Sequence, residues 1–174
     1  GLVGSEMCIR DRYRLAIMTV STSGYTGDRT DTGSEAISEV LSQPDYETVE
    51  YCIVDDNKEM ISRQMAVWAD RDDIDILVST GGTGLGPRDV TPEAWLSIID
   101  KEVPGLAESM RSETLKFTPM AMLSRSVAGI RGSTLILTLP GSPKAVKQTL
   151  EVVKPVLPHA LELLKAAKME NHPN

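Results

Sequence analysis

The sequence predicts an α/β fold in which helices pack around a mostly parallel central sheet. Short apolar runs alternate with helical patterns along most of the chain, which is typical of βα units. The run LAIMTV at 15–20 is almost continuously apolar, as expected for a strand that is covered on both faces. With 174 residues, the chain can form one domain whose core needs neither disulfides nor structural metals.

Four strands are expected from apolar or β-rich runs, and the connection after the third strand starts with a glycine-rich loop. The stretch 101–131 is less regular, because prolines interrupt its helical patterns, and we expect an insertion or an edge region there. The predicted strands occupy residues 15–20, 48–54, 74–79 and 134–139.

Helices are expected between these strands. Apolar residues at helical spacing predict one helix over 36–41 and another over 61–68. Thr91 and Ser142 each stand directly before a proline, so we expect both to cap the helices that begin there. The stretch 146–164 predicts one or two closing helices, broken around its two prolines.

The two ends of the chain differ from the domain between them. Residues 1–12 show no periodicity and no cap, so we expect a non-native or disordered leader, followed by a domain over 13–168 and a polar tail over 169–174. Cys8 and Cys52 match neither a disulfide framework nor a metal-binding spacing, which favours a reducing compartment. We therefore expect a cytoplasmic protein.

Charge and hydropathy limit the partners of the chain. A net charge of −7 disfavours broad nucleic-acid binding, which needs an electropositive face. No apolar run approaches the roughly 18 residues of a membrane span, so no membrane partner is expected. An anionic ligand would have to be held by local features of the chain.

One such feature is the glycine-rich segment TGGTGLG at 80–86, which follows the third predicted strand. Its glycines allow backbone N–H groups to approach a ligand and, with the following helix, to form an anion cradle. The segment is not a P-loop, because Pro87 and Arg88 follow Gly86, and it also lacks the third glycine of GxGxxG. A ligand-binding loop and a tight structural turn both remain open.

Acidic residues provide a second indication of a site. Asp56 follows the second predicted strand and Asp89 follows the glycine-rich segment, so a parallel sheet would bring both to the same edge. Two carboxylates beside a phosphate are consistent with one holding Mg²⁺ and the other orienting a nucleophile. Alternatively, Asp55 and Asp56 cap the next helix, and Asp89 simply begins another.

Other chemistry has less support. His159 and His172 have no GxSxG nucleophile to serve, so a hydrolase triad is unsupported. Four cations could serve an anionic site or could instead make surface ion pairs of little consequence. These cations are Arg88, Arg125, Arg131 and Lys144.

Taken together, three segments carry a family resemblance. They are STGGTGLGPRDVTPEA at 79–94, FTPMAMLSRSVAGIRGSTLILTLPGSPKAV at 117–146, and the TVS and TDTG elements at Thr19 and Thr30. In this order they resemble the MogA/MoaB family of molybdenum cofactor biosynthesis, and the stretch from Phe117 is similar to the G domain of gephyrin and its plant counterpart. The resemblance implies a three-layer molybdopterin-binding sandwich in a family that usually forms trimers.

The resemblance also implies a nucleotidyltransferase. With Mg²⁺, AMP would pass from ATP to molybdopterin and pyrophosphate would be released. The partner proteins implied are two further copies of the chain, in a homotrimer, and a MoeA-like molybdenum-insertion enzyme. The alternative is a MoaB-like module that binds molybdopterin without catalysis. Asp56 and Asp89 resemble the catalytic acids of the family, with Asp56 as a possible Mg²⁺ ligand. The substrate-binding positions carried over are Ser21, Asp31, Gly33, Thr80, Gly81, Gly82, Thr83, Gly84, Ser124, Ser126, Pro140, Gly141, Ser142, Pro143 and Lys144.

Overall fold

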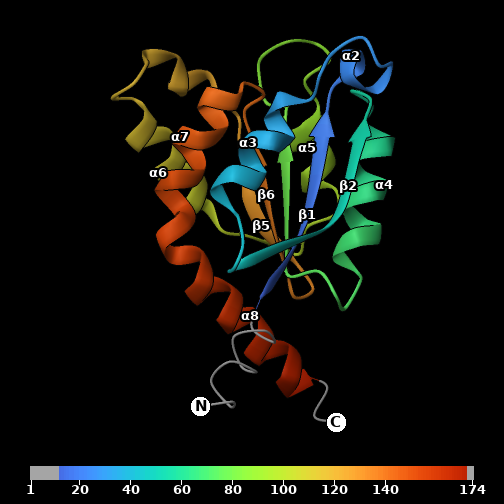
Figure 1. Cartoon of the computed structure of the whole chain (residues 1–174), viewed down its shortest axis with the longest axis vertical. Helices are drawn as coiled ribbons and strands as arrows, with labels where there is room; N and C mark the ends of the chain where they lie inside the picture. The colour runs from blue at the N-terminus through green and yellow to red at the C-terminus, as the bar shows by residue number, and fades with distance from the viewer. Residues whose placement is uncertain (1–11, 172–174) are drawn as a thin grey trace.

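A six-stranded mixed sheet lies between two layers of helices in the computed structural model, which describes residues 12–171 (Figure 1). Residues 1–11 of the predicted leader and 172–174 of the predicted tail lie outside the described residues. The strands are β1 (Tyr13–Val20), β2 (Tyr46–Val54), β3 (Ile76–Thr80), β4 (Lys101–Glu102), β5 (Ala128–Arg131) and β6 (Thr134–Leu139). The helices are α2 (Thr22–Tyr25), α3 (Thr32–Val40), α4 (Lys58–Ala69), α5 (Thr91–Leu96), α6 (Pro104–Thr114), α7 (Pro143–Val153) and α8 (Leu157–Asn171), with 3₁₀ turns η1 (Pro119–Leu123) and η2 (Lys154–Val156).

The sheet has the order β2-β1-β3-β6-β5-β4, and its first four strands are parallel. These are the four strands expected from the sequence, so the prediction of a mostly parallel sheet is confirmed. The irregular stretch 101–131 supplies the antiparallel edge strands β4 and β5. Thr19 is in register with Thr80, which in turn pairs with Leu139, so the loops after β1, β3 and β6 leave the sheet at the same edge.

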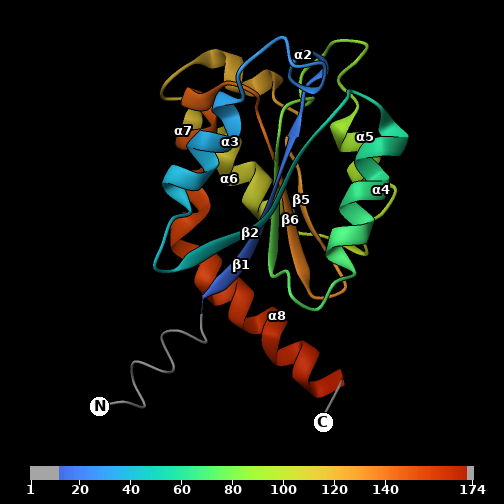
Figure 2. The same ribbon diagram turned by 45° about the vertical axis from the view of Figure 1, so that its right-hand side comes forward.

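Helices cover both faces of the sheet (Figure 2), and each face has its own apolar core. Leu15 and Ile17 of β1 point to the face covered by α3, α6, α7 and the start of α8. Ala16 and Met18 alternate with them and face α4 and α5, where Trp95 is fully buried. Because successive strand residues point to opposite faces, a strand buried on both sides should be almost continuously apolar, as the run 15–20 is, with Thr19 as its one polar residue.

The helix boundaries confirm one predicted cap and correct another. The Ser142 hydroxyl accepts a hydrogen bond from the Ala145 N–H at 3.2 Å, so Ser142 caps α7 as predicted. The prediction for Thr91 is wrong, because the N-cap position of α5 is Val90 and no side chain caps this helix. The Thr91 hydroxyl instead donates to the Gly81 carbonyl at 3.0 Å.

The closing helices are broken near the first of the two prolines. A 3₁₀ turn that contains Pro155 separates α7 from α8. Pro158 lies in the first turn of α8, where a missing N–H is tolerated. α8 then extends beyond the strand ends that are opposite the loop edge described above (Figures 1 and 2). None of the helices in 12–171 is both long enough and apolar enough to span a membrane.

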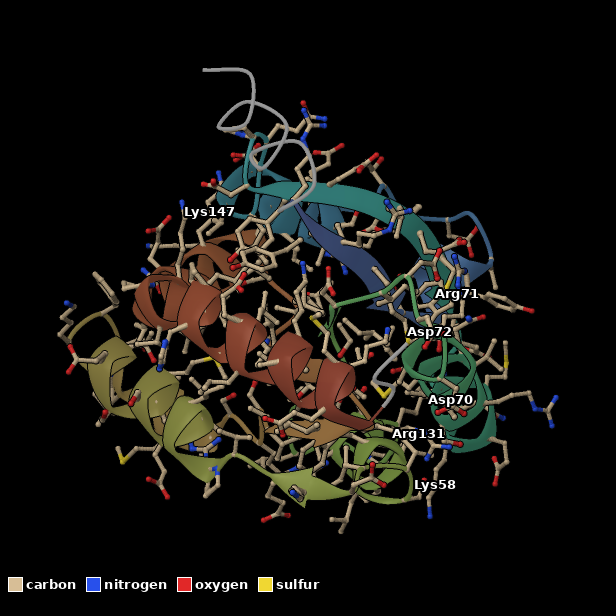
Figure 3. The ribbon with its side chains drawn as sticks, turned by 90° about the horizontal axis from the view of Figure 1, so that it is seen from below. Lys58, Asp70, Arg71, Asp72, Arg131 and Lys147 are labelled. Carbon is tan, nitrogen blue, oxygen red and sulfur yellow. The ribbon has the colours of Figure 1, made fainter. Side chains whose placement is uncertain are left out.

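Ion pairs occupy the end of the molecule at which the parallel strands begin (Figure 3). Arg131 pairs with Asp70 at 2.9 Å, and Arg71 pairs with Glu50 and Asp73 at 2.7 Å. These charges lie on the surface, where such pairs contribute little to stability. Arg131 is therefore engaged away from the loops at the carboxyl edge of the sheet.

Candidate active site

A cavity of about 730 Å³ lies at the carboxyl edge of the parallel strands. The loops that follow β1, β2, β3 and β6 all contribute to its walls. This is the position at which ligands bind in open α/β sheets, because loops and helix N-termini converge there. Residues from these four loops include Ser21, Asp56, Gly81 and Gly141.

A second cavity of about 520 Å³ adjoins the first. Gly82, Asp89, Gly141 and Ser142 line both cavities, so the two open around the same pair of loops. The second cavity is more apolar, because α6 and η1 contribute to its wall. Its apolar lining side chains include Met110, Met120, Ala121 and Leu123.

The glycine-rich loop needs glycine at 81 and 82, the positions of its first two glycines. Gly81 and Gly82 have φ angles of +100° and +71°, in the region that side chains disfavour. A Cβ on Gly81 would lie 2.2 Å from the Val20 carbonyl oxygen, and one on Gly82 would lie 2.2 Å from the Thr91 hydroxyl. The loop is thus a tight turn, and it also lines both cavities.

Asp56 is held at the first cavity by Thr22, the residue that begins α2. One carboxylate oxygen of Asp56 accepts the Thr22 N–H at 3.0 Å and lies 2.8 Å from the Thr22 hydroxyl, whose single proton is shared with an Asp55 carboxylate oxygen at 2.6 Å. The other oxygen accepts no hydrogen bond from a described residue. Asp55 does not line the cavity. The hydrogen bond from Thr22, and to a lesser extent that from the Asp56 N–H, lowers the pKa of the Asp55 carboxyl.

The alternative in which Asp55 and Asp56 cap the next helix is wrong. Asn57 is the N-cap of α4, and its side-chain oxygen accepts the Met60 N–H at 3.0 Å. Asp89 does not cap α5 either, since the N-cap position there is Val90. The three aspartates are therefore not explained by helix capping.

Asp89 resembles Asp56 in its geometry. One of its carboxylate oxygens accepts the Gly86 N–H at 2.9 Å, and the other accepts no hydrogen bond within residues 12–171. Asp56 and Asp89 are far apart in sequence, yet both line the first cavity. Each presents a carboxylate that is anchored at one oxygen, so both side chains can bind a cation or a polar ligand without giving up their existing bonds.

Arginines supply positive charge to the same cavity. Arg29 and Arg88 both line it, and neither forms an ion pair or hydrogen bond with another residue in the described part of the chain. Among the cations named from the sequence, only Arg88 lines the first cavity. Lys144 is exposed and lines neither cavity, while Arg125 binds the backbone of the glycine-rich loop.

The comparison with known proteins agrees with this geometry. A family model described as "Probable molybdopterin binding domain" matches residues 16–159 of the chain. The chain belongs to this family. The resemblance to the MogA/MoaB proteins is thereby confirmed, and so is the α/β fold expected from it.

Individual relatives support the assignment. The chain is 38% identical over 158 residues to a protein of Helicobacter pylori strain J99 named molybdopterin adenylyltransferase, covering 90% of both. It is 39% identical to the molybdenum cofactor synthesis protein cinnamon of Drosophila melanogaster, but spans only 25% of that longer protein. The crystal structure of the molybdopterin biosynthesis enzyme MoaB from Thermus thermophilus is 53% identical, with a TM-score of 0.84 over 88% of this chain and 97% of that one.

In this member of the molybdopterin-binding family, Asp31 is both a cavity residue and a helix cap. One carboxylate oxygen accepts the Ser34 N–H at 3.1 Å, and the other accepts the hydroxyls of Thr19, at 2.7 Å, and Tyr51. Burial opposes the charged form, but the hydrogen bonds from Tyr51, Thr19 and Ser34 outweigh it and lower the pKa of the Asp31 carboxyl. Because both oxygens are engaged, Asp31 has a clear structural role.

The other residues carried over by resemblance divide between the two cavities. Two of them, Lys144 and Ser126, line neither cavity. Ser126 is buried, and its hydroxyl lies 3.0 Å from the hydroxyl of Ser124, which lines the second cavity. The first cavity is lined by Ser21, Asp31, Gly33, Thr80, Gly81, Gly82, Gly141, Ser142 and Pro143. The second is lined by Gly82, Thr83, Gly84, Ser124, Pro140, Gly141 and Ser142.

Sequence reasoning missed several residues at these cavities, and three of them are polar or charged side chains with a clear place in the site. Thr22 anchors Asp56, Arg29 lines the first cavity, and Arg111 lines the second. Thr22 and Arg29 lie between Ser21 and Asp31, which the resemblance implies are substrate-binding positions, so their place in the sequence was a signal that could have found them. Arg111 lies on α6 in the stretch that was predicted to be irregular, and nothing in its local sequence indicates a site.

Proposed function

We propose that this chain is a molybdopterin adenylyltransferase, which transfers AMP from ATP to molybdopterin and releases pyrophosphate. The observation that carries the proposal is the pair Asp56 and Asp89, which line one cavity with one hydrogen-bonded oxygen each. The names of relatives from Helicobacter pylori and Escherichia coli, covered over most of their length, favour this enzyme over a binding module without catalysis.

The two adjoining cavities suit two substrates. In our proposal the triphosphate of ATP occupies the first cavity, where Arg29 and Arg88 are available to its negative charges. The pterin occupies the second, more apolar cavity, so that its terminal phosphate reaches the rim formed by Gly82 and Asp89. Aligning two polyanions and neutralising their charge is then the main contribution to catalysis.

The reaction needs no strong base. An oxygen of the molybdopterin phosphate forms a bond to the α-phosphorus of ATP, and the bond from that phosphorus to the bridging oxygen breaks. The bridging oxygen leaves with pyrophosphate, whose charge Arg29 and Arg88 would balance. The glycine-rich loop supplies close backbone approach, because a side chain at Gly81 or Gly82 would collide with its surroundings.

The acidic residues at the cavity fit Mg²⁺. Within the described residues no three His, Cys, Asp or Glu side chains form a metal cluster. Mg²⁺ is commonly held by one or two carboxylates together with substrate phosphates, so a preformed cluster is not required. Asp56, with one oxygen left without a hydrogen bond, is the proposed ligand. When bound, Mg²⁺ would neutralise phosphate charge and favour in-line geometry.

The remaining parts of the proposal rest on family resemblance. We propose that the chain acts in the cytoplasm as a homotrimer. We also propose that a MoeA-like molybdenum-insertion enzyme uses its product. Both can be examined by size-exclusion chromatography with light scattering, for the chain alone and for its mixture with such an enzyme.

Turnover tests the central proposal. The protein is incubated with molybdopterin and Mg-ATP, and pyrophosphate is measured. We expect Asp89→Asn to abolish most turnover while the fold persists, because an asparagine oxygen can still accept the Gly86 N–H. Asp72→Asn is the control, since this exposed residue lies at the opposite end of the sheet and its substitution changes the charge equally. Molybdopterin binding by the wild-type protein without pyrophosphate release would select the non-catalytic alternative.

A further inference from the structure

The segment from Gly84 to Asp89 carries one of the two proposed catalytic acids on an exposed loop. Within it, the Gly86 N–H donates to the Asp89 carboxylate at 2.9 Å, and the Asp89 N–H donates to the Gly86 carbonyl at 3.1 Å. These bonds close the loop on itself but do not attach it to the domain. Leu85, at 67% exposure, shows that apolar burial does not hold the loop either.

Arg125 makes the attachment. Its Nε–H donates to the Gly84 carbonyl at 2.9 Å, and its Nη2–H donates to the Asp89 carbonyl at 2.6 Å. Within residues 12–171, these two are the hydrogen bonds that join 84–89 to the rest of the protein. One planar group thus bridges the first and last residues of the loop.

Further bonds fix Arg125 itself. Its backbone N–H donates to the Thr83 carbonyl at 2.9 Å, and its Nη1 is paired with the Glu93 carboxylate. The hydrogen bond from Arg125 lowers the pKa of Glu93, so the ion pair persists at neutral pH. On the other side, Arg111 donates to the Ser126 carbonyl at 2.6 Å and holds the segment that carries Arg125.

The guanidinium of Arg125 does not contribute to the lining of the two cavities. Arg125 lines neither cavity, whereas Arg29 and Arg88 line the first. Its guanidinium is compensated by Glu93 and engaged by backbone carbonyls. Its effect on a reaction must therefore act through the position of Asp89.

We infer that Arg125 is a positioning residue, which holds the loop 84–89 so that the Asp89 carboxylate stays at the rim shared by the two cavities. The inference rests on the proposed adenylyl transfer for its catalytic consequence, but the attachment of the loop is independent of it. The bridge needs the fixed fork of a guanidinium. A lysine ammonium at the same place keeps the charge but cannot meet both carbonyls in the same geometry.

Arg125→Lys and Arg125→Gln test this inference, with Arg131→Lys as the matched control. Arg131 also bridges a carboxylate, that of Asp70, and a backbone carbonyl, that of Ile98 at 2.7 Å, but it does so away from the cavities. Both Arg125 variants should lower kcat about tenfold to a hundredfold, the range expected for displacing a reacting group by about 1 Å. KM for ATP and for molybdopterin should change little, and Arg131→Lys should leave both constants unchanged.

Hydrogen exchange supplies a readout that does not depend on activity. Protection of the Gly86 N–H reports directly on the Asp89 carboxylate, because the two are hydrogen-bonded. This amide should exchange about tenfold faster in Arg125→Lys than in the wild type or in Arg131→Lys, as expected for a loop that opens locally. Thermal unfolding by circular dichroism checks that each variant remains folded.

The outcomes separate the inference from the proposed function. Wild-type kcat in Arg125→Lys, or unchanged protection of the Gly86 N–H, would overturn the bridging role. A raised KM for molybdopterin with unchanged kcat would make Arg125 a binding residue and equally overturn it. Absence of turnover in the wild type would contradict the adenylyl transfer, while the exchange of Gly86 would still decide whether Arg125 holds the loop.

Discussion

Replacing Asp31 with alanine should destabilise the domain, because this side chain caps α3 and accepts two hydroxyl hydrogen bonds. Loss of an aspartate cap costs about 1 kcal/mol. Thr19 is only 7% exposed, and a buried hydroxyl donor that loses its acceptor costs a further 1 to 3 kcal/mol, roughly. Tyr51 is 47% exposed and can turn to water, so it adds little. The expected total is about 2 to 4 kcal/mol.

Asp31→Asn separates the charge from the cap. The amide oxygen can still accept the Ser34 N–H, so we expect a smaller loss of about 1 kcal/mol at neutral pH. Because the folded-state pKa of Asp31 is lowered from the ordinary value of 3.8, the contribution of the charge is complete above that value. It is lost as pH falls through the folded-state pKa. The difference between wild type and Asp31→Asn should therefore shrink in acid.

Urea unfolding measures both effects. The buried Trp68 and Trp95 report the transition by fluorescence, and the free energy of unfolding comes from linear extrapolation. Asp28→Asn is the control, since Asp28 lies in the same loop, is exposed, and has a side chain that accepts a hydrogen bond only from the Thr26 hydroxyl among the described residues. A loss below about 0.5 kcal/mol in Asp31→Ala, the size of an ordinary surface change, would refute the reasoning. A raised KM without lost stability would instead make Asp31 a substrate ligand.

Three further substitutions address the metal, the glycine turn and a buried phenol. Asp56→Asn should raise the Mg²⁺ concentration needed for half the maximal rate more than it weakens molybdopterin binding, and the opposite pattern in a titration would reverse its proposed role. Gly82→Ala should cost about 2 to 4 kcal/mol in urea unfolding, from its positive φ and from contact with the Thr91 hydroxyl, and a loss below that of an ordinary surface change would contradict the crowding. Burial raises the pKa of Tyr46 to about 12, and its hydroxyl has no described hydrogen-bond partner. Tyr46→Phe should therefore keep or slightly raise the melting temperature. The wild type should lose stability as pH rises from 10 towards 12, and the variant should not show this loss. A clear drop in the melting temperature of the variant would instead reveal a partner for the phenol.

The parallel strands could be predicted because burial on both faces favours almost continuous runs of apolar residues, as in 15–20. The edge strands β4 and β5 could not. β4 has only two residues, and β5 contains Gly129, whose missing Cβ makes room for the Trp95 ring. A glycine in a short run reads as an irregular segment, although the strand forms because β6 offers it a hydrogen-bonding partner.

The same distinction applies to the candidate site. The positions of Asp56 and Asp89 follow from strand order, because the ends of parallel strands lie at one edge of the sheet. The contacts that hold these two side chains in place could not be predicted from the sequence. Arg125 was expected either to serve an anion or to make a surface pair, and its main partners are backbone carbonyls. Every residue has a carbonyl, so no sequence pattern indicates which of them an arginine will bind.

Thr91 shows how burial overrides a local rule. Threonine before proline favours an N-cap, but Thr91 is fully buried and lies inside the helix. The left-handed turn at Gly81 and Gly82 directs the Gly81 carbonyl to the Thr91 hydroxyl. A buried carbonyl without a donor is costly, so the hydroxyl serves the glycine-rich loop, while the Thr91 N–H donates to the Gly82 carbonyl at 3.1 Å. The missing side-chain cap of α5 and the tight turn at Gly81 and Gly82 therefore have the same cause. The Thr91 hydroxyl binds the loop that lines both cavities and does not cap the helix.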